Sequence, residues 1–518
     1  ATVSLAAIKI GSVLLGLAPW ETLLVASVIT VIYTSLGGLR GVIITDFFQF
    51  TLAMIGMIWA AVVILKQPEI GGVEGLLNHP ELNGKLSFLP DFNDWELTWT
   101  IFILPLAVQW WAVWYPGAEP GGGGYIVQRM LSAKDEKNAI GATLLFNIAH
   151  YALRPWPWIL IALASLVFFP LRMNPGADGE RYHVAATAEA FLAERVGEEE
   201  VARLADHTNT LAGRQPDSLA VDYRRLAGVI AAHPRSLEVR SLAYIFAEKN
   251  EGETDPAAWS DPLADEGLVY LQLAQPELPV HKLGQDLGFS LMLRYLPPGL
   301  LGLLVAALVA AFMSTLSTHL NWGASYLVND VYRRFYRPEA GEQEMVRLGR
   351  ILTVVLMALA ALLALVLENA LDAFYIILQI GAGTGLIFIL RWFWWRINAF
   401  SEITAMVVSF LVAIYFEFIH GVDLPTHTRL LWGVGITTAS WLAATWLTRR
   451  TDIDTLIRFY RLIRPHSAGW DAVIRQAIKK EELFAPIPTS SLAMELSCLF
   501  AGCFLVYGLL FATGWALY

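Results

Sequence analysis

Residues 310–321 read AAFMSTLSTHLN and place two adjacent hydroxyl side chains, Ser314 and Thr315, inside a long apolar segment. Ser317 and Thr318 follow one helical turn later. Hydroxyl and carbonyl oxygens are the ligands that small hard cations prefer, and polar groups at membrane depth tend to face the protein interior or a transport pathway. Small hydroxyl residues also pack helices together. The stretch alone therefore predicts either half of a cation site or a packing seam.

The rest of the chain has the composition of an all-α polytopic membrane protein. Hydrophobic residues make up 56% of the 518 residues and charged residues 16%, and several apolar runs reach the roughly 20 residues that a spanning helix needs. We predict about ten membrane helices, some of them broken and the first one marginal. They cover residues 3–17, 20–37, 44–66, 98–116, 139–169, 297–319, 345–367, 370–392, 400–419, 428–448 and 489–517.

The N-terminus lies within apolar sequence. The chain begins at Ala1 with no Met and no signal-peptide pattern, so we expect it to be a fragment that lacks N-terminal helices. The sequence contains no phosphate-binding loop, so we do not infer that ATP hydrolysis drives this protein. The two cysteines, Cys498 and Cys503, exclude a disulfide framework, and we expect them to be small core residues.

Basic residues cluster on alternate loops. The clusters lie at residue 40 and in 129–137, 333–350, 391–396 and 449–480, whereas the intervening short loops carry only Lys66, Lys85, Arg172 and Arg429. By the positive-inside rule the clustered loops are cytoplasmic. We therefore expect a plasma-membrane protein, in bacteria an inner-membrane protein, with the C-terminal Tyr518 outside.

One segment carries the whole net charge of the chain. Residues 178–286 hold twenty acidic and ten basic residues, and the chain as a whole has a net charge of −10. Apolar positions three or four apart predict short helices there. The insert could be a lid, a partner-binding module or a neutral insertion. The predicted organisation is a first membrane part (1–175), an acidic helical extracytoplasmic insert (176–285), a second membrane part (286–448), a cytoplasmic amphipathic segment (449–488) and a C-terminal membrane helix (489–518).

The cytoplasmic segment contains TLIRFYRLIRPHSAGWDAV. Its mixture of arginine and aromatic residues suits a helix that lies at the membrane surface. We expect a structural role.

The stretch QWWAVWYPGAEPGGGGYIVQR (109–129) must interrupt a helix. A helix from 98 to 129 would be about 48 Å long, and its prolines and glycines break it. Broken helices at membrane depth line cavities, and in transporters they form binding sites. Glu119 could pair with Arg154, meet a substrate amine, line an ion path or be solvated at the cytoplasmic interface. Trp110 could stack on a substrate or face lipid.

Asn147, His150 and Arg154 recur at spacings of three and four, so they share one face of the helix predicted over 139–169. A buried arginine needs an acidic or carbonyl partner, so we expect a structural role for Arg154. His150 could line the cavity or serve packing alone.

Three further residues are candidates. Tyr375 and Gln379 lie one turn apart, and a glutamine at membrane depth is costly unless it forms a hydrogen bond, with a substrate hydroxyl or with a neighbouring helix. Asp46 follows Thr45 at the start of the helix predicted over 44–66. The pair suits an N-cap, although a carboxylate at an inner mouth could also receive a departing cation.

Four stretches resemble the sodium:solute symporter family and are spread over most of the chain. They are VITVIYTSLGGLRGVIITDFFQ (28–49), YIVQRMLSAKDEKNA (125–139), AAFMSTLSTHLNWGASYLVNDVYRRF (310–335) and LRWFWWRINAFSE (390–402). The resemblance implies a five-plus-five inverted repeat of the leucine-transporter type that works by alternating access. It also implies that the helix at 297–319 is the eighth core helix and descends from outside to inside.

The resemblance also implies roles for single residues. It places sodium on the carbonyl of Ala311 and the hydroxyls of Ser314 and Thr315, with the rest of the site on a broken first helix that we expect to be missing. Asp46 would lie near the sodium exit. Tyr375 would be an aromatic outer gate, Gln379 a contact to the substrate and His150 a neighbour of it. The glycines at 121–124 and the long insert depart from the sugar-transporting members, which weakens any assignment of a sugar substrate.

We therefore predict a sodium-coupled symporter that imports a small organic solute, such as a sugar, an amino acid or a carboxylate. Sodium would be the co-transported ion, with no other metal, and the bilayer and the solute would be the partners, with no nucleic acid. A symporter-like sensory module without net transport is the alternative. A membrane enzyme using Glu119, His150 and Arg154 would need a nucleophile or a metal cluster, which the sequence lacks, so we expect no enzyme.

Overall fold

The computed structural model describes residues 2–36, 39–87, 89–109, 111, 130, 132–175, 184–366, 370–416, 424–480 and 491–517. Within these ranges the side chains of residues 2, 33–46, 109, 366, 370–378, 382, 426 and 468 are outside the description. Every regular element in the described ranges is helical. The chain divides into two compact units, the first comprising Ala1–Leu86, Arg154–Ala370 and Leu517–Tyr518, and the second comprising Ser87–Leu153 and Leu371–Ala516.

Several helices are long and apolar enough to cross a membrane. Among the described residues there are six, or seven if α1 (Thr2–Leu15) and α2 (Pro19–Leu36), which meet at a bend of 114°, form one broken span. The six are Phe47–Leu65, Glu136–Phe168, Pro298–Tyr336, Glu342–Leu365, His427–Leu447 and Leu492–Leu517. An all-α polytopic membrane protein is therefore confirmed. The inverted repeat stays a prediction.

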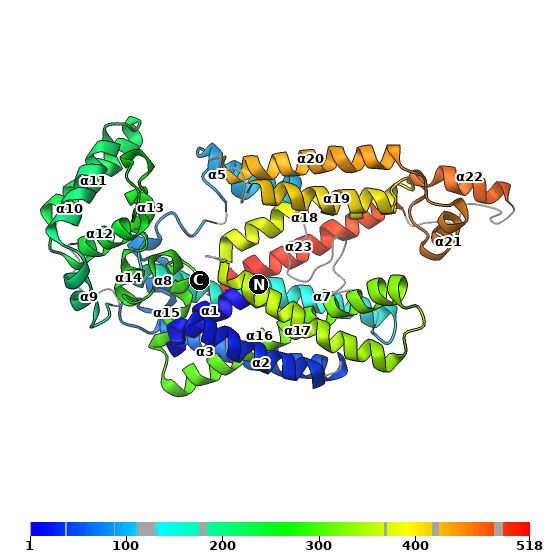
Figure 1. Ribbon diagram of the computed structural model, residues 1–518, viewed down its shortest axis with the longest axis horizontal. Helices are drawn as coiled ribbons and strands as arrows, with labels where there is room; N and C mark the ends of the chain where they lie inside the picture. The colour runs from blue at the N-terminus through cyan, green and yellow to red at the C-terminus, as the bar shows by residue number, and fades with distance from the viewer. Residues whose placement is uncertain are drawn as a thin grey trace. The chain divides into compact units, whose positions relative to one another are not determined.

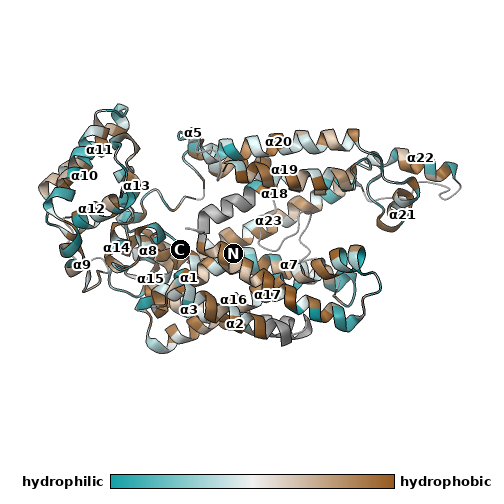
Figure 2. Cartoon of the chain, in the orientation of Figure 1, coloured by the Kyte–Doolittle hydropathy of each residue, from teal (hydrophilic) through white to brown (hydrophobic). Residues whose placement is uncertain are grey.

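In the first unit the membrane helices pack around α16 (Pro298–Tyr326), which contacts α1, α2, α3 (Leu39–Leu65) and α17 (Glu342–Val366). Hydrophobic colour predominates along α16 and α17 (Figure 2). A Cβ atom at Gly56 of α3 would lie 2.8 Å from Leu304 Cδ2 of α16, so glycine is what allows these two helices to approach. Leu304 is 1% exposed as a result.

The acidic insert is a bundle of short helices in the first unit. It contains α9 (Ala188–Arg195), α10 (Glu198–Ala212), α11 (Asp217–Ala232), α12 (Leu237–Lys249), α13 (Pro262–Glu266) and α14 (Val269–Ala274), and α15 (Leu287–Met292) follows it. Helices α10 and α11 lie side by side (Figure 1). The buried core of the insert is continuous with residues of α3, α8 (Pro155–Phe168) and α16. The insert and the membrane helices of this unit therefore share one hydrophobic core.

A buried ion pair also joins the insert to α1. Lys9 Nζ donates to both carboxylate oxygens of Asp286, at 2.8 and 2.7 Å, and the Lys9 side chain is only 7% exposed. An isolated ammonium group inside an apolar core would be very costly, so such a lysine requires its carboxylate partner.

The second unit contains α5 (Trp95–Thr98), the π-helical segments Trp99–Ile103 and Pro105–Gln109, α7 (Glu136–Asn147), and helices α18 (Ala370–Phe393) to α23 (Leu492–Leu517). Within it, α19 (Ala399–Ile414) and α20 (Thr426–Leu447) run side by side (Figure 1). Asn398 caps α19 by accepting from the backbone N–H groups of Phe400 and Ser401. Its amide also donates to Thr448 Oγ1 at 3.0 Å, which joins the start of α19 to the end of α20.

Helix α23 exposes its cysteines. Cys498 and Cys503 are both exposed, so the expectation that they are core residues is wrong. None of the described residues of α23 is buried. The helix is apolar around its circumference, as a lipid-facing span must be, and burial of these thiols by the protein is therefore not required.

We expect the Glu266→Ala substitution to destabilise the insert by about 3 kcal/mol, because breaking a buried ion pair leaves its partner groups unsatisfied. Glu266 is 2% exposed, and it accepts from Met173 N at 2.6 Å and from Arg225 Nη2 at 3.0 Å. Hydrogen exchange of the insert amides in the full chain measures the effect. Glu198→Ala is the control, because Glu198 and Arg235 are 3.7 Å apart and at least 85% exposed. Equal effects of the two substitutions would contradict the prediction.

We expect the insert to lose stability as the pH falls below about 6.5, through His207. Burial lowers the pKa of His207, and the charges of Arg214 and Arg203 lower it further. As the pH falls, the unfolded chain therefore binds a proton at His207 more readily than the folded insert does, and the folded insert loses stability. The buried carboxyls of Asp265 and Glu238 have pKa values raised by burial and act in the opposite sense.

The effect of His207 is isolated by comparing variants. In His207→Gln, the acid-induced increase in hydrogen exchange of α10 and α12 should be smaller than in the wild type. His281→Gln, at an exposed position of the insert, should leave it unchanged. An undiminished acid response in His207→Gln would rule out His207 as the cause.

Candidate functional site

The hydroxyl stretch lies on α16 and borders a cavity within the first unit. The cavity has a volume of about 270 Å³ and is lined by residues of α1, the α1–α2 connection, α2 and α16, among which α16 contributes Ala311 and Thr315. Residues four apart in a helix lie on the same face. The structure therefore brings two of the three predicted sodium ligands together on one cavity wall.

Thr315 and Ala311 are joined by a hydrogen bond. Thr315 Oγ1 donates to the carbonyl oxygen of Ala311 at 2.9 Å. The hydroxyl oxygen keeps its acceptor lone pairs, so both oxygens can still serve as ligands. Since their separation is that of a single hydrogen bond, one hard cation could contact both.

Ser314, the third predicted ligand, is half-buried and does not contribute to the lining of this cavity. Consecutive helical residues point about 100° apart, so Ser314 and Thr315 face different directions. The carbonyl oxygen of Ser314 accepts a hydrogen bond from Thr318 Oγ1 at 3.1 Å. Ser317 is completely buried, and its Oγ has no hydrogen-bond partner among the described residues. The hydroxyls of α16 are therefore distributed over more than one face.

Thr22 on α2 is a cavity residue that sequence reasoning missed. Apart from Thr315 it is the only residue with a polar side chain in the described lining. It is 8% exposed, and its Oγ1 has no hydrogen-bond partner among the described residues. A Cβ atom at Gly11 would lie 2.6 Å from this oxygen, so α1 and α2 can meet here because residue 11 is glycine. A lone threonine in a helix usually donates to a backbone carbonyl of the preceding turn, so sequence alone did not mark Thr22 as a cavity residue.

Four predicted site residues cannot be located in full. Asp46 lies in α3 and Tyr375 in α18, but their side chains are outside the described residues, as are Trp110 and Glu119 entirely. Helix α3 begins at Leu39, so the alternative that Thr45 and Asp46 cap its N-terminus is wrong. The site roles of all four residues stay predictions.

Gln379 of α18 lies inside the second unit and is 8% exposed. A Cβ atom at Gly433 of α20 would lie 3.5 Å from Gln379 Nε2 and 3.8 Å from Val412 Cγ1 of α19. Nε2 has no hydrogen-bond partner within the described ranges. The side chain is thus packed beside Gly433 of α20, with an amide donor that no described residue satisfies, and contact with a substrate stays a prediction.

His150 is held by aromatic rings. It lies in the π-helical segment Ile148–Leu153, where its ring stacks on Phe146 with centroids 4.9 Å apart and meets the edge of Tyr151 at 4.7 Å. Single π-helical turns occur frequently at functional sites. Two aromatic rings are thus among the neighbours of His150, and its proximity to a substrate stays a prediction.

Comparison with known proteins gives one family. The model of the sodium:solute symporter family matches residues 5–199 and 280–409, which is more than half of the chain. The unmatched residues between these two ranges, 200–279, belong to the acidic insert.

Two curated relatives are similar over shorter stretches. A sodium/glucose cotransporter of Vibrio parahaemolyticus is 30% identical over 151 residues, which cover 28% of each chain. A sodium/proline symporter of Haemophilus influenzae is 34% identical over 120 residues, 22% of this chain and 23% of the relative. The chain thus spans about a quarter of the length of the curated relatives that it matches.

A solved structure of a substrate-bound, outward-open Na⁺-coupled sialic acid symporter superposes with a TM-score of 0.37 and 16% identity, over 87% of this chain and 74% of that one. A superposition at this level carries no argument. The family model is evidence of membership, because its two matched ranges contain all four stretches that resemble the family. The chain belongs to the sodium:solute symporter family.

Proposed function

We propose that this protein is a sodium-coupled secondary symporter that imports a small organic solute by alternating access. The observation that carries the proposal is the Ala311–Thr315 oxygen pair on a cavity wall, inside the region that matches the family model. The names of the matched relatives, a sodium/glucose cotransporter and a sodium/proline symporter, support a small solute as cargo.

In this proposal sodium binds the carbonyl of Ala311 and the hydroxyls of Ser314 and Thr315. Hard cations take about six oxygen ligands or more, so other oxygens must complete the shell. The Thr22 hydroxyl, which has no hydrogen-bond partner among the described residues, is a candidate for one of them. The bound cation would stabilise an outward-open state. Asp46 would receive the ion on its way to the cytoplasm.

The solute would bind between the broken segment 98–130 and α18. Trp110, Glu119, His150, Tyr375 and Gln379 are the proposed contacts. Moving one charge inward is worth roughly 2.3 kcal/mol per 100 mV of membrane potential, which is enough to concentrate a neutral solute. The catalytic machinery of an enzyme is not part of this proposal.

The proposed location is the plasma membrane, with the basic loops and residues 449–488 in the cytoplasm. The acidic insert and Tyr518 would lie outside. This orientation rests on the alternation of basic loops. In the outside position the insert's own fold has to be stable in contact with solvent, which its continuous buried core allows.

We expect Ser314→Ala/Thr315→Ala to abolish sodium-dependent uptake while folding stays intact, because two of the three proposed ligands lose their oxygens. Uptake is measured in proteoliposomes under a sodium gradient against a panel of sugars, amino acids and carboxylates. Thr315→Ser keeps the hydroxyl and should retain sodium dependence. Unchanged sodium dependence in the double variant would contradict the site.

The site can also be tested without knowing the solute. Sodium, compared with potassium, should raise the thermal stability of the wild type, since a ligand that binds only the folded state stabilises it. Thr353→Ala on α17 is the matched control. Thr353 is 4% exposed and donates to Gly349 O at 2.9 Å, the same bond that Thr315 makes. The stabilisation by sodium should persist in Thr353→Ala and vanish in Ser314→Ala/Thr315→Ala.

A further inference from the structure

Helix α1 forms one wall of the cavity and is attached to a second segment through Lys9. Ile10 and Gly11 of α1 belong to the lining of the cavity, whereas Lys9 does not. Lys9 Nζ donates instead to both carboxylate oxygens of Asp286, at 2.8 and 2.7 Å. Because a buried charge needs its partner, α1 keeps the position in which this ammonium group reaches Asp286.

Asp286 lies on a segment that the rest of the first unit holds in place. It directly precedes α15, whose residues Leu287, Leu291 and Met292 are fully buried. Helix α15 contacts α8 and lies beside α1 (Figure 1). A Cβ atom at Gly284 would lie 2.8 Å from Asp286 Oδ1, so glycine leaves the space that the carboxylate occupies. The carboxylate is therefore a fixed point against which α1 is held.

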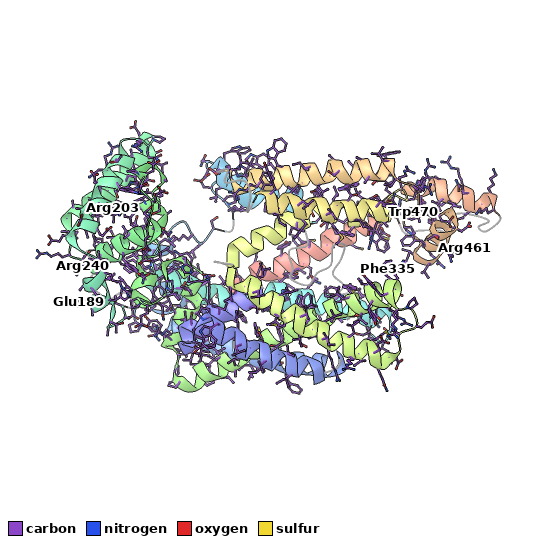
Figure 3. All side chains as sticks on the ribbon, viewed as in Figure 1. Glu189, Arg203, Arg240, Phe335, Arg461 and Trp470 are labelled. Carbon is purple, nitrogen blue, oxygen red and sulfur yellow. The ribbon has the colours of Figure 1, made fainter. Side chains whose placement is uncertain are left out.

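The same segment connects the acidic insert to α16. Gln285 Nε2 donates to the carbonyl oxygen of Gly267, which directly follows α13, at 3.1 Å. Figure 3 shows the side chains of the insert and labels Glu189, Arg203 and Arg240 among them. In the other direction, α15 and the 3-10 helix Leu293–Tyr295 lead to α16. The Lys9–Asp286 pair thus joins α1 to a segment that is bound to the insert and continues into α16.

A displacement of α1 would change the cavity. A Cβ atom at Gly11 would lie 2.6 Å from Thr22 Oγ1, so α1 and α2 are in direct contact at a polar group of the lining. Helix α1 also contacts α16, which contributes Ala311 and Thr315 to the lining. The spacing of α1 from α2 and α16 therefore sets the room that is available to a cation.

We propose that Lys9 and Asp286 are positioning residues of this cavity. Their ion pair holds α1 at the spacing from α2 and α16 at which the cavity oxygens take up sodium, and neither residue contacts the ion. A buried ion pair is often no more stabilising than apolar residues of similar size, so we assign this pair to position rather than to stability. The inference rests on the proposed function for the identity of the cation, but the position of α1 is testable without sodium.

The first test removes the pair and measures the sodium requirement of the full chain. Lys9→Met/Asp286→Leu leaves no unpaired charge, so its thermal stability should stay close to that of the wild type. We expect it to need at least about fivefold more sodium for half-maximal thermal stabilisation, the lower end of the couplings measured between two sites. Asp286→Asn weakens the pair at constant size and should act in the same direction. Lys9→Arg keeps the charge and should stay close to the wild type.

The matched control is a second buried ion pair of the first unit, Arg225 with Glu266. Arg225→Met/Glu266→Gln removes its charges, and the glutamine keeps an acceptor for the backbone N–H of Met173. Neither α11 nor α13 contributes to the described lining of the cavity, so the sodium requirement should not change. An equal change in both double variants, or an unchanged requirement in Lys9→Met/Asp286→Leu, would overturn the proposal.

Spin labels report the position of α1 directly and without sodium. Leu15 of α1 and Val309 of α16 are exposed and border the cavity. Labels are attached to Leu15→Cys and Val309→Cys after Cys498→Ser and Cys503→Ser remove the other cysteines. Electron paramagnetic resonance then measures the distance distribution between the two helices.

The two measurements separate this inference from the proposed function. We expect a narrow distance distribution while the Lys9–Asp286 pair is present and a broader or shifted one in Lys9→Met/Asp286→Leu. Identical distributions with and without the pair would overturn the positioning role, whatever the response to sodium. A wild type that sodium does not stabilise relative to potassium would instead contradict the proposed sodium site.

Discussion

The membrane part of this protein depends on one constraint, which is that a polar group in apolar surroundings must find its partner inside the chain. Threonine meets it repeatedly by donating to the carbonyl four residues earlier. Thr315, Thr353 and Thr445 form such bonds at 2.9, 2.9 and 2.7 Å. The bond that makes a threonine tolerable in a helix also places a hydroxyl beside a carbonyl, which is the pair of oxygens that a hard cation can use.

Surroundings therefore distinguish a ligand from a packing residue. Thr353 is buried against neighbouring helices, whereas Thr315 and Ala311 border a cavity. Thr22 also borders this cavity. Its hydroxyl has no hydrogen-bond partner among the described residues and lies where α1 and α2 meet at Gly11. A cation in this cavity would satisfy oxygens that the helices themselves leave available.

The acidic insert is subject to the same constraint, and there it applies to charged groups. In the insert, charges are drawn inward and paired, as in Lys9 with Asp286 and Arg225 with Glu266, because the insert shares its core with the membrane helices. Buried charges of the insert are thus held by partners within the chain.

The sequence by itself determined the all-α membrane class, the family and the hydroxyl motif of α16, because apolar length, helical spacing and short motifs are local properties. It also indicated the insert from charge alone. Only the tertiary structure decided that Ala311 and Thr315 share a cavity while Ser314 does not line it, that Thr22 joins them, that Gln379 packs beside Gly433 of α20, and that the cysteines of α23 are exposed. Those outcomes depend on which helices become neighbours, and a sequence does not show which face of a helix a neighbour will cover.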